Sequence, residues 1–232
     1  MPKKSLSIIA AVIVLSGYIF LENAGAETIF LKTGEQISAK ILEKNDEYVV
    51  IDFNGTPITY CSYEIEKIEA DSPQQQLENQ LKLADQYKKQ KDYASAKKEY
   101  EKVIELDPKS WIAYTELANI YSMEKEFTQA QDLSLKALEY NEKNYLAWSI
   151  LGTSYYALGG NLKKAEEALI RSMEIQPNND AFQGLLLVTE GYEKNKQYKE
   201  ARNILSHLSS FNPPADLQKI IEEQLKRIKR FK

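Results

Sequence analysis

Side chains suited to redox or metal chemistry are scarce in this chain of 232 residues, which has one cysteine and one histidine. The single cysteine, Cys61, cannot form a disulfide within the chain, so the fold has to rely on packing. The sequence also lacks a Walker phosphate loop, a His-Glu metal motif and a Gly-x-Ser-x-Gly motif. We therefore predict no catalytic, cofactor-binding or metal-binding residues, and a protein that is not an enzyme.

The single histidine and the single cysteine both have ordinary structural interpretations. His207 falls between the apolar residues Leu205 and Leu208 of a helical pattern, which predicts that it faces solvent. Cys61 lies in an apolar strand pattern and is expected to be a small buried residue rather than a reactive thiol. An enzyme with an unrecognised site stays open as a third function class.

A large excess of charge is absent as well. The chain has 30 Lys and Arg against 34 Asp and Glu, a formal net charge of −4. Such a mild charge implies no general attraction to nucleic acid. Hydrophobic residues make up 43% of the chain, an ordinary globular composition that suffices for one or two modest domains.

The first 26 residues have the pattern of a secretory signal peptide. Lys3 and Lys4 precede an apolar run over residues 6–21, and the small residues Ala24 and Ala26 follow. We expect cleavage after Ala26 and export to the periplasm or cell envelope. The alternative is an uncleaved inner-membrane anchor formed by residues 6–21.

Residues 27–70 show the alternation typical of β-strands. The expected strands cover residues 28–32, 36–43, 48–53, 56–61 and 66–69, with a single helical turn over 62–65. Asn54-Gly55 is a strong hairpin signal. Five short strands with a turn of helix before the last resemble a small SH3-like β-barrel. Residues 71–76 are expected to be a polar linker.

Helical periodicity follows, in four units of about 34 residues: 77–110, 111–144, 145–179 and 182–215. A small residue recurs in the first helix at Ala84, Ala118 and Gly152, followed by an aromatic residue. Those aromatic residues are Tyr87, Tyr121, Tyr155 and Tyr192. The second helices open with Ala96, Ala130, Ala165 and Ala201, and Pro108, Pro177 and Pro213 end three of them. This pattern resembles the tetratricopeptide repeat (TPR) family. The predicted fold is mainly α, a TPR helical-hairpin solenoid preceded by a small all-β (SH3-like) domain.

Residues 216–232 are expected to form a capping helix for the last repeat. Asp216 is a candidate N-cap, and one apolar stripe runs along the segment. The stripe consists of Leu217, Ile220, Ile221, Leu225 and Ile228. The rest is charged and mostly basic, so membrane contact is expected only through this helix or through an uncleaved signal segment.

The resemblance implies a concave groove lined by exposed positions of the first helices. These positions are Asp85 and Lys88 in the first repeat, Thr115, Asn119, Ser122 and Met123 in the second, Ser149, Thr153 and Tyr156 in the third, and Glu190 in the fourth. The basic and Asn residues by which chaperone-type repeats clamp a C-terminal carboxylate are replaced by Leu81, Asp85, Glu116, Leu146 and Ile150.

The resemblance and the composition together imply a protein–protein interaction adaptor or scaffold that binds a protein or peptide in this groove. The groove could also be merely solvated, with the partner bound elsewhere. The alternative function is a ligand-binding module, in which the β-barrel binds a glycan or peptide and the repeats mediate oligomerisation. Homo-oligomers are compatible with either function.

Overall fold

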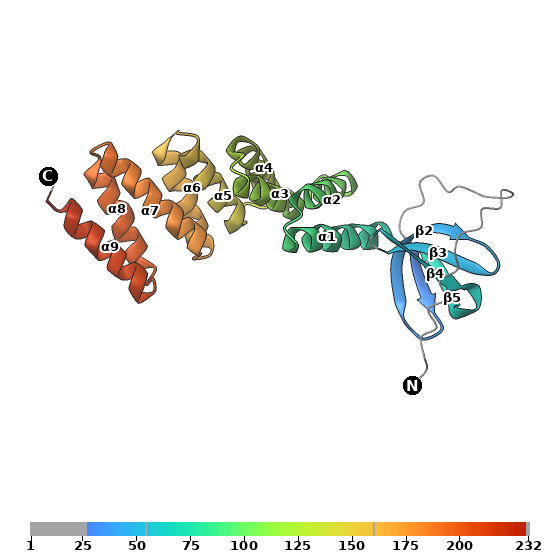
Figure 1. Cartoon of the computed structure of the whole chain (residues 1–232). Coiled ribbons are helices and arrows are strands. Elements are labelled where there is room, and N and C mark those ends of the chain that lie inside the picture. Colours follow the sequence, from blue (N-terminus) through green and yellow to red (C-terminus); the bar gives the residue numbers. More distant parts are fainter. Residues whose placement is uncertain (1–26, 54, 160, 231–232) are drawn as a thin grey trace. The chain divides into compact units, whose positions relative to one another are not determined.

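The computed structural model describes residues 27–53, 55–159 and 161–230, so the predicted signal peptide lies outside the described residues. The chain divides into two compact units, one ending at Gln76 and one beginning at Leu77. Figure 1 shows strands in the first unit and helices in the second.

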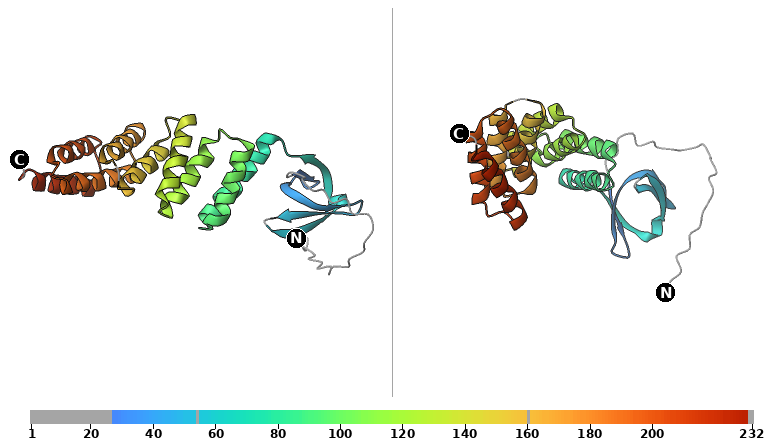
Figure 2. Two further views of the ribbon diagram at one scale, coloured as in Figure 1. Left: turned by 90° about the horizontal axis from the view of Figure 1, so that it is seen from above. Right: turned by 60° about the vertical axis from the view of Figure 1, so that its left-hand side comes forward.

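The first unit is one antiparallel sheet of five strands in the order β4-β3-β2-β1-β5. The strands are β1 Glu27–Leu31, β2 Gln36–Lys44, β3 Tyr48–Phe53, β4 Thr56–Cys61 and β5 Ile65–Ala70, and a 3₁₀ turn, η1, covers Ser62–Glu64. β2 pairs with both β1 and β3, and a register shift between Ile41 and Glu43 lies in its pairing with β3. Figure 2 shows the strong curvature of the sheet. The SH3-like comparison stays a prediction.

Alternation along the strands builds the core of this unit. Ile37, Ala39 and Ile41 are buried on one face of β2, together with Ile29 of β1 and Ile51 of β3. A pleated strand directs every second side chain to the same face, which explains this pattern. β3 and β4 meet at Phe53 and Thr56, and Gly55 between them has a φ of 80°, the left-handed region that glycine tolerates best.

The predicted linker over 71–76 differs in the structure. Asp71 is 4% exposed and accepts hydrogen bonds from the hydroxyls of Thr28 and Ser38, both at 2.5 Å. Helix α1 already begins at Pro73. Proline is well suited to the first turn of a helix because its missing N–H would have no partner there. These residues therefore combine sheet contacts with the first turn of a helix.

Nine α-helices are found in the described part of the chain, in a TPR-like arrangement that confirms the predicted helical solenoid preceded by a small β domain. Their bounds are α1 Pro73–Lys89, α2 Tyr93–Leu106, α3 Trp111–Met123, α4 Phe127–Tyr140, α5 Tyr145–Ala157, α6 Leu162–Ile175, α7 Asn179–Lys194, α8 Tyr198–Ser210 and α9 Ala215–Ile228. Successive helices from α2 to α9 pack on one another.

Close helix packing centres on Leu169 of α6, which is fully buried. A Cβ added at Gly152 of α5 would lie 2.5 Å from its Cγ, and one added at Gly184 of α7 would lie 2.8 Å from its Cδ2. The two glycines thus make room for one leucine from opposite sides. Leu169 belongs to the core cluster that joins α6, α7, α8 and α9.

Helix α9 starts with Pro214 in the N-cap position, so Asp216 lies in the first turn and is not the N-cap. Ile221 and Ile228 are fully buried, whereas Ile220 is 39% exposed and falls outside the buried stripe. Leu217 and Leu225 pack partly buried against the same core cluster. No helix in the described part of the chain is long and apolar enough to cross a membrane.

Candidate functional site

The first helices of successive repeats lie against one another and form a common surface. α3 contacts α5, and α5 contacts α7. The side chain of Lys88 on α1 forms an ion pair with Glu116 on α3 at 2.5 Å. We call the exposed and half-exposed positions of these four helices the odd-helix face.

Eight of the ten predicted groove residues offer surface, and two do not. Asp85, Met123 and Glu190 are exposed, and Lys88, Asn119, Ser122, Thr153 and Tyr156 are partly exposed. Thr115 and Ser149 are 4% and 2% exposed, so their expected exposure is corrected: these residues are buried and cannot line a binding surface.

A hydrogen-bonded contact between repeats explains the burial of Thr115. Its hydroxyl donates to the carbonyl of Trp111 one turn back, at 2.7 Å, and accepts from the side-chain N–H of Asn144 at 2.5 Å. Asn144 is also the N-cap of α5, where its side-chain oxygen accepts from the backbone N–H of Ala147. Thr115 therefore ties α3 to the start of the next repeat.

At the α1 end, polar side chains are occupied by contacts within the protein. The hydroxyl of Tyr100 on α2 donates to Asp85 at 2.5 Å. Burial raises the pKa of Tyr100, and the hydrogen bond to Asp85 raises it further. Lys88 is engaged by Glu116. The polar side chains at this end of the face thus stabilise contacts between helices, and few of them are free to bind a partner.

The middle of the face is different. Within the described residues, the side chains of Asn119 and Ser122 make no hydrogen bond, and Met123 is 55% exposed. On the neighbouring α5, the Thr153 hydroxyl donates to the carbonyl of Ser149 at 2.9 Å and retains its acceptor capacity. α3 and α5 therefore bring an amide, hydroxyls and a flexible apolar side chain together on one surface.

Tyr156 has a packing role that its sequence position did not indicate. Its ring lies near Gly191 of α7, where an added Cβ would be 3.4 Å from the ring edge. The side chain packs against the core cluster of the last repeats. Because the ring supports the contact between α5 and α7, its hydroxyl is the part free to meet a partner.

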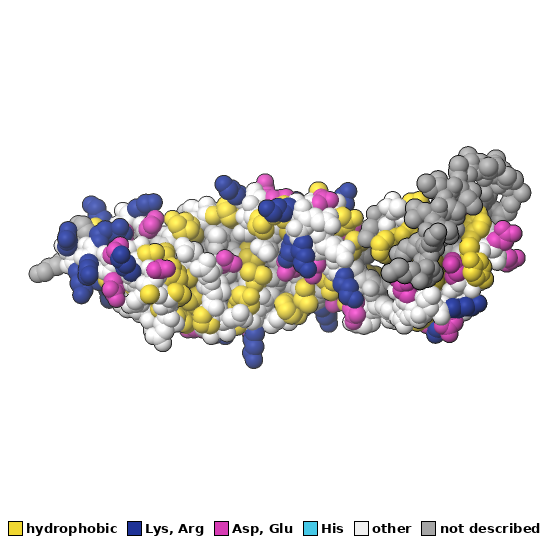
Figure 3. Space-filling model, turned by 60° about the horizontal axis from the view of Figure 1, so that its bottom comes forward, with side chains coloured by type: hydrophobic (Ala, Val, Ile, Leu, Met, Phe, Trp, Pro, Cys, Tyr) yellow, Lys and Arg dark blue, Asp and Glu magenta, His cyan; other side chains and the backbone are white. Residues whose placement is uncertain are grey.

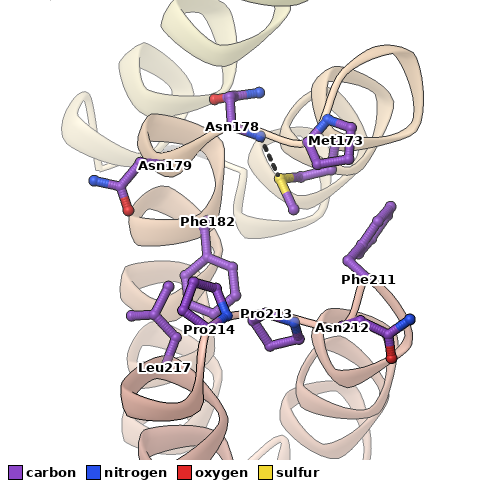
Figure 4. Close-up of a pocket in the computed structure, with 10 residues that line it drawn as sticks. Met173, Asn178, Asn179, Phe182, Phe211, Asn212, Pro213, Pro214 and Leu217 are labelled. Carbon is purple, nitrogen blue, oxygen red and sulfur yellow. Dashed lines mark hydrogen bonds between the residues drawn. The ribbon is translucent and has the colours of Figure 1, made fainter.

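The structure adds a cavity of about 290 Å³ between the α6–α7 turn and the α8–α9 turn, and none of the predicted groove residues lines it. Figure 4 shows Phe182, Pro213, Pro214 and Leu217 around it, with Met173 and Phe211 toward the right of the view. The Met173 sulfur accepts the backbone N–H of Asn178 at 3.5 Å. The Pro213-Pro214 pair with Phe211 just before it is a sequence signal for such an apolar turn.

The single histidine is not the solvent-facing residue that its spacing predicts. His207 is half-buried, and its ring meets Phe211 edge-on with 5.0 Å between the ring centres. Its Nε2 is enclosed and has no hydrogen-bond partner in the described part of the chain. Cys61 is partly exposed, against the expected burial. No cluster of metal-ligating side chains occurs among the described residues.

Charged and apolar side chains are distributed unevenly on the surface. Figure 3 shows apolar side chains along the helical unit and a gathering of Lys and Arg at its C-terminal end. α9 and the residues after it contribute Lys219, Lys226, Arg227, Lys229 and Arg230, all exposed. Arg227 forms an ion pair with Glu193 of α7 at 2.7 Å.

Comparison with known proteins identifies the repeats. Two family profiles, each described as a tetratricopeptide repeat, match residues 78–110 and 99–132. The helical part of the chain therefore contains TPR repeats, as the spacing predicts. A comparison with curated protein sequences finds no match.

Solved structures similar to this chain include two of the protein MamA. One is 25% identical, with a TM-score of 0.52 over 59% of this chain and 78% of that one. The other is 18% identical, with a TM-score of 0.53 over 66% and 88%. The first TPR domain of Spaghetti (RPAP3), solved bound to the HSP90 peptide SRMEEVD, is 26% identical with a TM-score of 0.47, over 50% of this chain and 93% of that domain.

Proposed function

We propose that this protein is an exported adaptor that binds an extended segment of a partner protein on the middle of the odd-helix face. The observation that carries the proposal is the half-exposed amide of Asn119, whose side chain makes no hydrogen bond within the described residues. An amide is both donor and acceptor, so it can pair with the N–H and C=O of an extended peptide backbone.

The surroundings of Asn119 suit such a partner. Met123 is a flexible apolar side chain that adapts to different apolar groups, and it extends from the same helix. The hydroxyls of Ser122, Thr153 and Tyr156 offer further polar contacts on α3 and α5. One amide, several hydroxyls and one adaptable apolar side chain favour a segment recognised through its backbone and one or two apolar residues.

Recognition of a C-terminal carboxylate has no support at the usual positions. Ile150 is 5% exposed, Leu81 and Leu146 are apolar, and Asp85 and Glu116 are acidic. The nearby cation, Lys88, is paired with Glu116. The proposed partner segment is therefore one recognised without its C-terminal carboxylate.

Export is proposed from the sequence of the first 26 residues. The purified protein from an envelope fraction should have Glu27 as its first residue by intact-mass analysis. A full-length species retained in the inner membrane would favour the anchor formed by residues 6–21.

The binding surface can be tested by placing the photocrosslinking residue p-benzoylphenylalanine at single sites in the full chain. Position 123 reports the odd-helix face. Leu135 on α4, 44% exposed, is the matched control on a second helix of the same repeat. We expect a discrete crosslinked partner from position 123 and none from position 135.

Side-chain variants then separate recognition from folding. Asn119→Ala combined with Tyr156→Phe should abolish the crosslink from position 123, because it removes one amide and one hydroxyl while keeping the tyrosine ring in place. Lys229→Ala with Arg230→Ala should leave it intact. Loss of the crosslink in this second variant, with retention in the first, would place the partner on the basic C-terminal helix instead.

A further inference from the structure

The cavity between the α6–α7 and α8–α9 turns arises from the length of one helix. The recurring tyrosine near the end of each first helix gives a common reference point. α3 and α5 begin ten residues before their tyrosines, Tyr121 and Tyr155, whereas α7 begins thirteen residues before Tyr192. α7 thus has almost one extra turn at its start. The α8–α9 turn, with Pro213 and Pro214, runs past this extra turn and leaves about 290 Å³ between them.

The walls of the cavity are apolar, and its inner part is fixed in place. Met173 and Phe182 are 2% and 3% exposed and belong to the largest core cluster, and Phe211 and Leu217 pack against that cluster. Pro213 and Pro214 have no backbone N–H that would need a hydrogen-bond partner. No charged side chain lines the cavity, so an occupant has to be uncharged at this point.

The polar groups of the cavity lie on three asparagines, two of which are free. Asn178 is the N-cap of α7, and its amide donates to Ser172 and to the carbonyl of Gln176. The side chains of Asn179 and Asn212 are exposed and make no hydrogen bond within the described residues. Figure 4 shows these two amides at opposite sides of the opening.

We propose that this cavity binds one large apolar side chain, such as Phe or Leu, from an extended segment of a partner protein. Its volume of about 290 Å³ lies just below the range for ligand pockets, about 300–1,000 Å³, which suits a single side chain. Asn179 and Asn212 pair with the peptide groups on either side of that residue. The neutral apolar interior is complementary to an apolar side chain, and the two amides at the opening are complementary to the peptide groups beside it. The site is separate from the middle of the odd-helix face on α3 and α5, and it does not depend on the function proposed there.

Methionine methyl groups provide a direct test, because Met173 lines the cavity and Met123 lies on the odd-helix face. The full chain labelled with ¹³C-methyl methionine is titrated with the peptide acetyl-Gly-Phe-Gly-amide, with acetyl-Gly-Ser-Gly-amide and with toluene. We expect a saturable shift of the Met173 signal with the Phe peptide, at least about tenfold stronger than with the Ser peptide, in line with burial of one aromatic side chain. The Met123 signal should stay unchanged.

Variants test the interior and the opening separately. Leu217→Trp fills the cavity and should abolish the Met173 shift, while Leu187→Trp, at an exposed position of α7 that does not line the cavity, should retain it. Asn179→Ala with Asn212→Gly, the glycine chosen because Asn212 has a φ of 50°, should weaken binding of the Phe peptide by about five- to tenfold without affecting toluene, the loss expected for one or two hydrogen bonds. An unchanged thermal unfolding curve in each variant shows that the fold is intact. Phe182→Leu, which removes ring contacts from the interior, gives a second loss-of-binding variant if Leu217→Trp does not fold.

Three results would overturn the proposal. The first is a Met173 signal that does not move at millimolar Phe peptide. The second is toluene binding as tightly as the peptide with no effect of the asparagine variants, which would make the cavity a site for small apolar molecules. The third is a shift of Met123 in place of Met173, which would place the peptide on the odd-helix face and leave the proposed function standing.

Discussion

Three lysines have backbone conformations that are costly for any residue with a Cβ atom. Lys91, Lys125 and Lys196 have φ values of 62°, 65° and 60°, in the left-handed region. Each stands two residues before the aromatic residue that opens the second helix of its repeat, at Tyr93, Phe127 and Tyr198. In the third repeat Gly159, with a φ of 69°, stands at the corresponding bend. The turn geometry therefore favours glycine, and three of the four repeats use lysine.

Replacing Lys125 with glycine should raise stability. The left-handed conformation costs a residue with a Cβ roughly 1–2 kcal/mol, and glycine avoids it. Glycine also increases the entropy of the unfolded chain, so we expect a net gain of about 0.5–1 kcal/mol. Thermal unfolding followed by circular dichroism should show a melting temperature about 1–4 °C higher.

The matched control is Lys136→Gly, at an exposed position inside α4. Glycine there should cost about 1 kcal/mol, because the helix interior disfavours it. A loss of stability in both variants would show that the left-handed turn at Lys125 does not carry the expected strain.

At the residue scale, the repeat spacing is a better predictor of buried side chains than of exposed ones. Buried Ala84, Ala118 and Gly152 follow from the spacing, because close helix packing requires small residues at these positions. The burial of Thr115 does not follow from it. It depends on a hydrogen bond from Asn144, which lies 29 residues further along the chain. Such a contact requires the three-dimensional stacking of one repeat on the next.

Helices α5, α6 and α7 are locked together by one side chain and two glycines. Leu169 lies between Gly152 and Gly184, and neither position has room for a methyl group without movement of the leucine. At Gly152 a backbone atom is also close, since an added Cβ would be 3.0 Å from the carbonyl oxygen of Ala165. Backbone cannot move aside as a side-chain end can.

Gly152→Ala should therefore destabilise the helical unit. Overpacking of a core typically costs about 1–3 kcal/mol, which exceeds the gain of up to about 1 kcal/mol in helix propensity. Chemical unfolding should show a lower midpoint with an unchanged slope.

Two further variants define the cause. Gly191→Ala is the matched control, because its nearest contacts are the flexible end of Leu162 and the ring of Tyr156, and it should cost less. In a Leu169→Ala background, Gly152→Ala should cost less, because the contact with Leu169 is gone and only the one with the carbonyl oxygen of Ala165 remains. Equal losses in both backgrounds would contradict a steric role of Leu169.

At the element scale, helices and strands with a clear period could be predicted from the sequence, and departures from the period could not. The helix ends before Pro108, Pro177 and Pro213 follow from the proline chemistry. In a strict repeat, the residues of the extra turn of α7 would belong to the loop between α6 and α7. Because they are helical instead, a cavity forms beside Phe182. The polar run over 71–76 predicts a linker. In the structure, the hydrogen bonds from Thr28 and Ser38 to the buried Asp71 attach the start of this run to the sheet.

In the helical unit as a whole, α9 takes the place of a further repeat. Each helix pair leaves an apolar side that its neighbour covers, so a repeat array needs a polar-faced element at its end. α9 covers the core of α7 and α8 with Ile221 and Ile228 and directs its basic residues outward. A single amphipathic helix thus ends the stack.

Removing Asp216–Lys232 should consequently destabilise the helical unit and promote aggregation. The deletion exposes the surface beneath Ile221 and Ile228, and burial of each such side chain contributes roughly 1.5–3 kcal/mol.

The point variant Ile221→Asp tests the same contact without deletion. It should lower stability by at least about 3 kcal/mol, or the melting temperature by about 6–12 °C, because a charge is placed in an apolar core. Ile220→Asp, at a position 39% exposed on the same helix, should change the melting temperature by far less. Arg227→Ala, which breaks an exposed ion pair with Glu193, should cost no more than about 1 kcal/mol. If the deletion and Ile221→Asp both leave the melting temperature unchanged, α9 is a free helix and the fourth repeat is stable with its apolar side open.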